Sequence, residues 1–155
     1  MGIKSFQGNQ VKDLKTVVHK VSVADCMQRN VIVFTEDMSL VEAMKIMIKE
    51  KVSGGPVVNL HREVVGILSE GDCVKQISDS RYYNMPMSDI SVGSKMSHEI
   101  VTVFPTENIF DVASKFLNLK RRRFPVIENG VLVGLVSQKI VLRVALELSG
   151  NNWKK

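Results

Sequence analysis

The sequence predicts an α/β protein of the α+β kind, made of two similar β-α-β-β-α halves. One observation behind this prediction is an internal repeat, because Met27 and Met96, like Pro56 and Pro125, are 69 residues apart. In addition, strand-like and helix-like hydrophobic patterns follow one another in the same order in both halves. Finally, an Asn-Gly pair at 129–130 separates two apolar runs, which is a strong hairpin signal because both residues accept positive φ.

The first half begins with a strand and a helix. The β-branched run NVIVF at 30–34 predicts the strand. Residues 39–51 carry apolar side chains at helical spacing, with Ser39 as a suitable N-cap and Glu42 at the capping-box position, so they predict the helix. Two short strands around a polar turn and the start of a second helix complete this half: GPVVNL at 55–60, EVVGILS at 63–69 and EGDCVKQIS at 70–78.

The second half repeats this order of elements. The polar stretch 75–95, which contains Pro86 and Gly93, predicts a connector with room for one helical turn between the halves. The elements expected after it are a strand at 99–104, a helix at 108–120, strands at 124–128 and 131–137, and a helix at 138–148.

The two halves should depend on each other for stability. At about 55 residues, neither buries enough surface alone, so we expect them to pack through their sheets by pseudo-twofold symmetry. The expected organisation is an N-terminal helical extension at 1–20, a first repeat at 21–78, a connector at 79–91, a second repeat at 92–148 and a basic tail at 149–155.

Composition restricts the class of protein. The 155 residues are 45% hydrophobic, but no apolar run approaches the roughly 18 residues that span a bilayer, so we expect a cytoplasmic protein without a membrane partner. Cys26 and Cys73 lack the paired spacing of a metal knuckle and are expected to be reduced and structural. The net charge of +5 is concentrated at the run KRRR, 120–123, and at the C-terminus, which could attract phosphate.

No catalytic pattern is visible. His19, His61 and His98 fall in different segments, and no Ser-His-Asp arrangement or set of metal ligands accompanies them. The SGG at 53–55 is too short for a phosphate-binding glycine loop and is better explained as a tight turn. We therefore expect neither an enzyme nor a metal site.

Two segments carry a resemblance to a known family. VSGGPVV at 52–58 and VVGILSEGD at 64–72 resemble parts of the cystathionine-β-synthase (CBS) domain, and roughly residues 20 to 147 resemble two such domains in tandem, a Bateman module in a stand-alone protein. The resemblance implies a regulatory sensor that binds an adenosine-containing molecule in clefts between the two copies and signals to a partner protein. It implies no catalytic cofactor.

The resemblance also implies a main ligand site at the end of the first repeat. The family pattern Gly, aliphatic, x, Ser or Thr, x, x, Asp matches Gly66, Ser69 and Asp72, where the hydroxyl would approach phosphate and the carboxylate would accept the ribose hydroxyls. From the residues alone, Ser69 and Asp72 could equally form a plain helix N-cap. The resemblance implies that this cleft is completed by Ile67, Ile100, Val101, Arg121, Arg122 and Arg123.

The second cleft departs from the family pattern. Ile140 stands where the second copy should have the acid, so ribose should bind there more weakly, by about 1 to 3 kcal/mol. By resemblance, the residues of this weaker cleft are Ile32, Val52, Ser53, Gly54, Ser137 and Lys139.

Several ligands and functions stay open at this point. The expected ligand is an adenine nucleotide such as AMP, ADP or ATP, with S-adenosylmethionine as an alternative, and the expected assembly is a homodimer with a regulated partner that the sequence does not identify. A second possibility is a structural, dimerising protein with vestigial clefts. Nucleic-acid binding through the arginine run and the tail residues Lys154 and Lys155 is disfavoured, because aromatic support is thin. Tyr82, Tyr83 and Trp153 lie in the connector or the tail.

Overall fold

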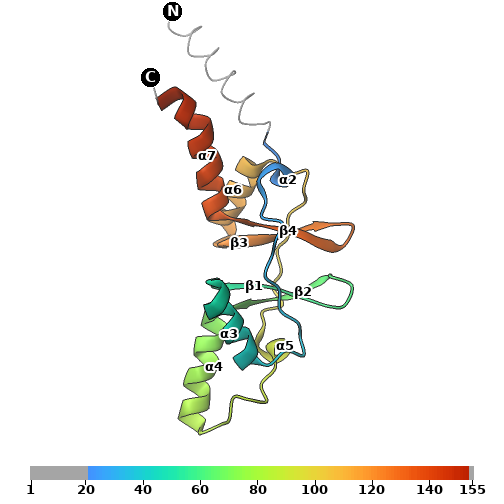
Figure 1. The fold of residues 1–155 in the computed structure, drawn as a ribbon, viewed down its shortest axis with the longest axis vertical. Coiled ribbons are helices and arrows are strands. Elements are labelled where there is room, and N and C mark those ends of the chain that lie inside the picture. The colour runs from blue at the N-terminus through green and yellow to red at the C-terminus, as the bar shows by residue number, and fades with distance from the viewer. Residues whose placement is uncertain (1–20, 154–155) are drawn as a thin grey trace, which may run out of the picture. The chain divides into compact units, whose positions relative to one another are not determined.

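The computed structural model describes residues 21–153 (Figure 1). The helix expected over 1–20 lies outside the described residues, as do Lys154 and Lys155. The elements run in the order α2 (Val23–Cys26), α3 (Leu40–Glu50), β1 (Gly54–Val58), β2 (Val64–Ser69), α4 (Glu70–Tyr83), α5 (Val92–Lys95), α6 (Ile109–Leu119), β3 (Arg123–Glu128), β4 (Val131–Ser137) and α7 (Gln138–Trp153).

The strands form two small sheets, which confirms the α+β class. Strand β1 pairs with β2, and β3 pairs with β4. In the antiparallel first sheet Gly54 lies opposite Ser69, and the register shifts between Val57 and Val58. The turn of the second hairpin has φ of 53° at Asn129 and 79° at Gly130, as the Asn-Gly signal predicted.

The strands predicted at 30–34 and 99–104 are not present as strands. Each is reduced to one parallel bridge, Phe34 with Val57 and Val103 with Val126. The Phe34 amide donates to the Pro56 carbonyl at 3.0 Å, and the Phe34 side chain is fully buried. Strand pairing in each run is therefore limited to one fully buried residue, Phe34 or Val103, and the other apolar residues are half-buried or exposed.

Helix α3 follows its local signals, whereas α4 runs further than predicted. The Ser39 hydroxyl accepts from the Glu42 amide at the start of α3. Helix α4 continues to Tyr83, through the first part of the predicted connector. Inside it, the buried Gln76 amide donates to the Ser80 hydroxyl at 2.8 Å, a polar pair that hydrophobic periodicity does not detect.

The chain folds into two compact units that exchange segments between the sequence repeats. Of the described residues, unit 1 contains 21–29 with 103–127 and 134–153, and unit 2 contains 30–102 with 128–133. Helix α2, from the first repeat, packs in unit 1, where the Val23 amide donates to the Glu107 carbonyl at 2.8 Å. Helix α5, from the second repeat, packs in unit 2, where the Val92 amide donates to the Met38 carbonyl at 2.8 Å.

Each exchanged segment places a methionine against a glycine. In unit 2, a side chain at Gly66 would overlap the Met96 thioether, and in unit 1 a side chain at Gly134 would overlap the Met27 sulfur. Both methionines are buried. The absence of a Cβ on the glycine is therefore what allows the other repeat's segment to pack closely against the strand.

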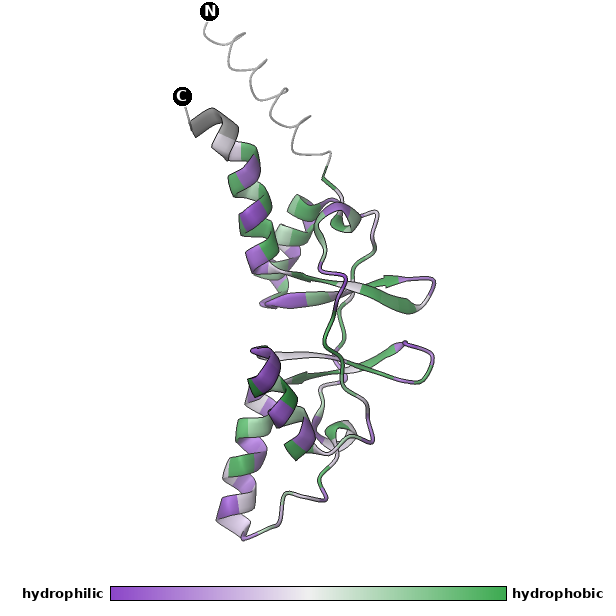
Figure 2. Ribbon diagram, in the orientation of Figure 1, coloured by the Kyte–Doolittle hydropathy of each residue, from purple (hydrophilic) through white to green (hydrophobic). Residues whose placement is uncertain are grey.

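The core of each unit lies between its hairpin and its helices, and Figure 2 shows hydrophilic and hydrophobic residues alternating along α3, α4 and α7. In unit 1, the rings of Phe116 and Phe124 stack at a centroid distance of 4.5 Å. In unit 2, the buried cluster comprises Phe34, Leu40, Ala43, Met47, Val57, Leu68, Cys73, Val92 and Met96.

Candidate functional site

Ser69 and Asp72 form a capping box where β2 passes into α4. Asp72 Oδ2 accepts from the Ser69 amide at 2.9 Å and from the Ser69 hydroxyl at 3.0 Å. The Asp72 amide in turn donates to Ser69 Oγ at 3.4 Å. The N-cap role inferred from the residues alone is therefore present, and it holds the carboxylate at the positive end of a helix of 14 residues.

The capping box leaves part of Asp72 available. Among the described residues, no group donates to Asp72 Oδ1, and the residue is half-buried. A carboxylate oxygen has two lone pairs, so Oδ1 can accept hydroxyl donors without disturbing the cap. The structural role of Asp72 and the ligand-binding role implied by the resemblance are thus compatible.

The residue after Asp72 belongs to the core. Cys73 is 3% exposed, and burial raises the pKa of its thiol, with smaller contributions from the carboxylates of Asp72 and Glu70. Burial also raises the pKa of the Cys26 thiol, and the negative charges of Asp25 and Glu147 raise it further by smaller amounts. Both thiols are free and protonated at neutral pH, as expected for structural cysteines.

Three apolar residues of the predicted main cleft lie in the same unit as Asp72. Ile67, on β2, exchanges backbone hydrogen bonds of 2.9 and 2.8 Å with Ser97. Ile100 and Val101 follow Ser97 closely in the chain, and both are half-buried. The bond pair thus anchors the segment that carries these two side chains to the strand that leads to Ser69 and Asp72.

The arginine run lies in unit 1. The carbonyl of Arg121 accepts from the Gln138 side chain at 3.1 Å, and that of Arg122 accepts from the Gln138 amide at 3.2 Å. The run therefore lies beside the first residue of α7. The convergence of Arg121, Arg122 and Arg123 with Asp72 on one ligand stays a prediction.

The residues assigned to the weaker cleft are divided between the units. In unit 2, the Ser53 carbonyl accepts from the Glu70 amide at 2.9 Å, and Gly54 lies opposite Ser69. Ile32 and Val52 are half-buried in the same unit. Ser137 and Lys139 lie in unit 1, at the junction of β4 and α7.

Ile140 occupies in unit 1 the position that Asp72 occupies in unit 2. Its amide lies 3.4 Å from Ser137 Oγ, so the hydroxyl cap is retained without the acid. The Ile140 side chain is 6% exposed and packs as a core residue. It offers no group that could hydrogen-bond to a ribose.

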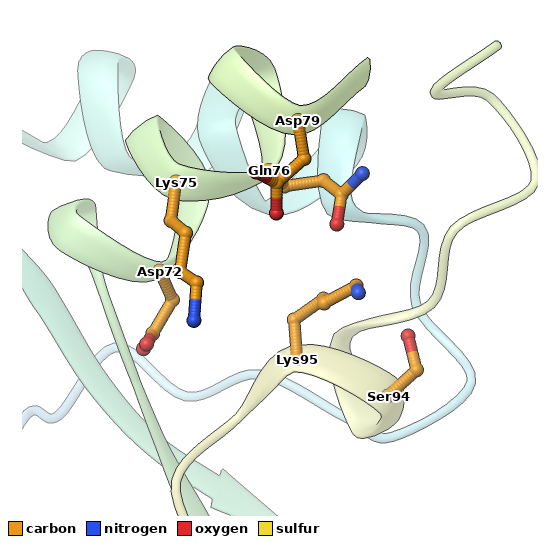
Figure 3. A pocket seen from close by; sticks show the side chains of 6 residues that line it. All are labelled: Asp72, Lys75, Gln76, Asp79, Ser94 and Lys95. Atoms are coloured by element: carbon orange, nitrogen blue, oxygen red, sulfur yellow. The ribbon is translucent and has the colours of Figure 1, made fainter. Parts of the chain in front are cut away.

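A polar cavity of about 270 Å³ opens beside Asp72, between α4 and α5 (Figure 3). Sequence reasoning missed this cavity, because it depends on the packing of a segment from the second repeat against α4. The residues that line it are Asp72, Lys75, Gln76, Asp79, Ser94 and Lys95.

The described part of the chain has neither a cluster of metal-ligating side chains nor a membrane-spanning helix. Over residues 21–153, no group of three or more histidine, cysteine, aspartate and glutamate side chains is arranged to hold a metal ion. In the same range, no helix combines the length and apolar composition needed to cross a membrane.

Comparison with known proteins identifies the same repeat. A family model of the CBS domain matches residues 23–79 and again residues 87–147. The chain is 27% identical over 153 residues to the chloroplastic CBS domain-containing protein CBSX2 of Arabidopsis thaliana, which covers 82% of this chain and 64% of that protein. It is 26% identical over 131 residues to the protein MJ1225 of Methanocaldococcus jannaschii, across 84% of this chain and 44% of that protein. The chain thus spans less than two thirds of either relative.

Solved structures share the fold. A crystal structure of CBSX2 in complex with AMP has a TM-score of 0.73 at 27% identity and covers 83% of this chain and 98% of that one. The CBS domain pair of protein MJ0100, in complex with 5′-methylthioadenosine and S-adenosyl-L-methionine, has a TM-score of 0.71 at 23% identity and covers 83% of this chain and 98% of that one. With two family matches that together span most of its length, this chain belongs to the CBS-domain family.

Proposed function

We propose that the protein is a regulatory module that binds an adenine nucleotide, with Asp72 as the ribose acceptor. The observation that carries this proposal is the free Oδ1 of Asp72, held by a capping box in the first turn of α4. Support also comes from CBSX2, a relative at 27% identity whose crystal structure is a complex with AMP. CBS pairs generally regulate other proteins, so binding rather than catalysis is the expected activity.

The geometry suggests how each group acts. The ribose hydroxyls would donate to Asp72 Oδ1, while Oδ2 keeps its bond to the Ser69 amide. The Ser69 hydroxyl now donates to Oδ2, and rotation about its Cβ–Oγ bond would redirect its hydrogen to a phosphate oxygen while Oγ still accepts from the Asp72 amide. Ile100 and Val101 would flank the base. Binding would therefore exchange one hydrogen bond within the cap for one to the ligand.

The arginine run would determine the number of phosphates. Guanidinium groups bind phosphate oxygens in bidentate fashion, so three adjacent arginines favour a di- or triphosphate over AMP if they reach the same ligand. Comparing AMP, ADP and ATP on wild-type protein and on Arg122→Ala measures this directly. Equal losses for all three nucleotides would show that Arg122 does not select by phosphate number.

The homodimer is proposed from a surface pattern that occurs twice. Ile48 on α3 and Leu117 on α6 occupy equivalent repeat positions and are 81% and 77% exposed. Val74 on α4 and Leu142 on α7 are a second equivalent pair, at 62% and 64%. A matching apolar face on each unit suits a symmetric interface between two copies of the chain. Light scattering should give a dimer for wild type and a monomer for Val74→Lys with Leu142→Lys.

Calorimetry with AMP, ADP, ATP, NAD and S-adenosylmethionine tests the binding proposal. Asp72→Ala should weaken binding of the preferred ligand by about 1.5 to 3 kcal/mol, which raises its dissociation constant tenfold or more. Asp111→Ala is the matched control, because Asp111 is an exposed acid in the first turn of α6. No binding of any ligand to the wild type, together with a stable dimer, would favour the alternative of a structural protein with vestigial clefts.

A further inference from the structure

The cavity between α4 and α5 carries charges of both signs. Asp72, Lys75 and Asp79 reach it from α4, and Lys95 reaches it from α5 (Figure 3). None of these four side chains forms an ion pair within 4.0 Å with another described residue. The ion pair seen among the described residues joins Lys115 to Glu107, away from this cavity. Two carboxylates and two ammonium groups therefore surround one hollow without forming ion pairs with one another.

A buried amide is also directed into this cavity. The Gln76 residue is 3% exposed, and its side-chain nitrogen donates to the Ser80 hydroxyl at 2.8 Å. No described group donates to the Gln76 side-chain oxygen, which lies across the hollow from the Lys95 side chain in Figure 3. Since no side-chain oxygen of the described residues is both buried and without a partner, this oxygen is open to the hollow, where it can accept from a donor on a bound molecule.

The mixture of charges restricts the class of ligand. A phosphate would be attracted by the lysines but repelled by Asp72 and Asp79. A divalent cation would meet the opposite conflict with Lys75 and Lys95. A molecule with an ammonium and a carboxylate group satisfies both, because its ammonium can face the acids and the Gln76 oxygen while its carboxylate faces the lysines. The Ser94 hydroxyl already donates to the Ser91 carbonyl at 2.7 Å, so towards a ligand it can act only as an acceptor.

We propose that this cavity binds a small zwitterion, namely a free α-amino acid or a related aminocarboxylate. The site stands on its own residues and meets the proposed nucleotide site only at Asp72. Because Oδ2 of Asp72 is used by the capping box, both ligands would need Oδ1. The zwitterion therefore competes with the nucleotide, and which ligand is bound depends on the relative concentrations of the two.

Direct binding of the twenty standard L-amino acids, measured by calorimetry, tests the proposal without any nucleotide. At least one should bind, and its N-acetyl and carboxamide derivatives, which each lack one charge, should bind roughly tenfold more weakly or worse. This comparison is made on unaltered protein, so it does not depend on the folding of a variant. Absence of binding, or equal binding of the derivatives, overturns the proposal.

Variants then locate the site. Lys95→Ala and Asp79→Asn should each weaken binding of the amino acid about tenfold. Lys49→Ala on α3 and Asp111→Asn on α6 are the matched controls, and they should leave this binding unchanged. Equal losses in the controls would refute the assignment to this cavity.

Competition with AMP is measured last. Amino-acid binding without nucleotide binding would contradict the proposed function alone, and nucleotide binding without amino-acid binding would contradict this inference alone.

Discussion

Gly66→Ala tests whether a segment of the second repeat really packs inside unit 2. Gly66 does not have positive φ, so alanine fits its backbone, and replacing a strand glycine without a clash should stabilise by about 0.4 to 1 kcal/mol. Here, however, the new methyl group would overlap the sulfur, Cγ and Cε of Met96. Overpacking of this kind costs about 1 to 3 kcal/mol, so the net effect should be a loss of about 1 to 2 kcal/mol in the free energy of unfolding.

Met96→Ala should reverse the sign of this effect. Alone it removes a buried side chain, 7% exposed, and should destabilise by about 2 to 5 kcal/mol. In that background Gly66→Ala no longer clashes and fills part of the cavity, so it should stabilise. The double-mutant cycle should therefore show a coupling of about 1 to 3 kcal/mol between two residues that are distant in the sequence.

Urea denaturation followed by circular dichroism supplies the four free energies of the cycle. Gly71→Ala is the control, because its new methyl group would meet only Ser69 Oγ, at 3.6 Å, in ordinary contact. It should be neutral or stabilising with either residue at position 96. Additive effects of Gly66→Ala and Met96→Ala would refute the exchange of segments.

Three further predictions concern stability. Phe124→Ala should cost about 3 to 5 kcal/mol by denaturation, because the ring is fully buried and stacked on Phe116, and a cost below about 1 kcal/mol would contradict the packing of unit 1. Ser69→Ala should lower the free energy of unfolding by about 1 kcal/mol through loss of the cap, and Ser69→Asp should restore part of it. Burial raises the pKa of the Cys73 thiol, so its contribution to stability is fully present below the unfolded pKa of about 8.5 and is lost as pH rises through the folded value. Cys73→Ala should therefore flatten the alkaline decline in the free energy of unfolding, and an unchanged slope would contradict this assignment.

The parts of the fold that were correctly predicted depend on local chemistry. Ser39 caps α3 because its hydroxyl meets an amide three residues ahead, and Asn129 with Gly130 forms the turn because both adopt positive φ. The sequence repeat likewise reveals that α2 and α5 are equivalent. It does not reveal that each packs with the opposite repeat, because this depends on contacts between residues far apart in the chain.

The errors have physical causes of the same kind. Residues 30–34 have the composition of a strand, but only one bridge forms, at the fully buried Phe34. The polar sequence at the end of α4 predicts a connector, although the buried pair Gln76 and Ser80 continues the helix with polar side chains. At the candidate site, both the N-cap and the free oxygen of Asp72 follow from the local motif. The cavity next to it could not be inferred, since Lys95 reaches it through the exchange of segments.

The central claim is that the Asp72 carboxylate binds a ribose, and it is tested most directly by removing the hydroxyls from the ligand and the charge from the protein together. Calorimetry would compare AMP with 2′,3′-dideoxy-AMP on wild type, on Asp72→Asn and on the control Asp111→Asn. If Asp72 accepts the hydroxyls, wild type and the control should prefer AMP by roughly tenfold or more, and Asp72→Asn should lose most of this preference. The same preference in all three proteins would show that the ribose is bound elsewhere and would contradict the account.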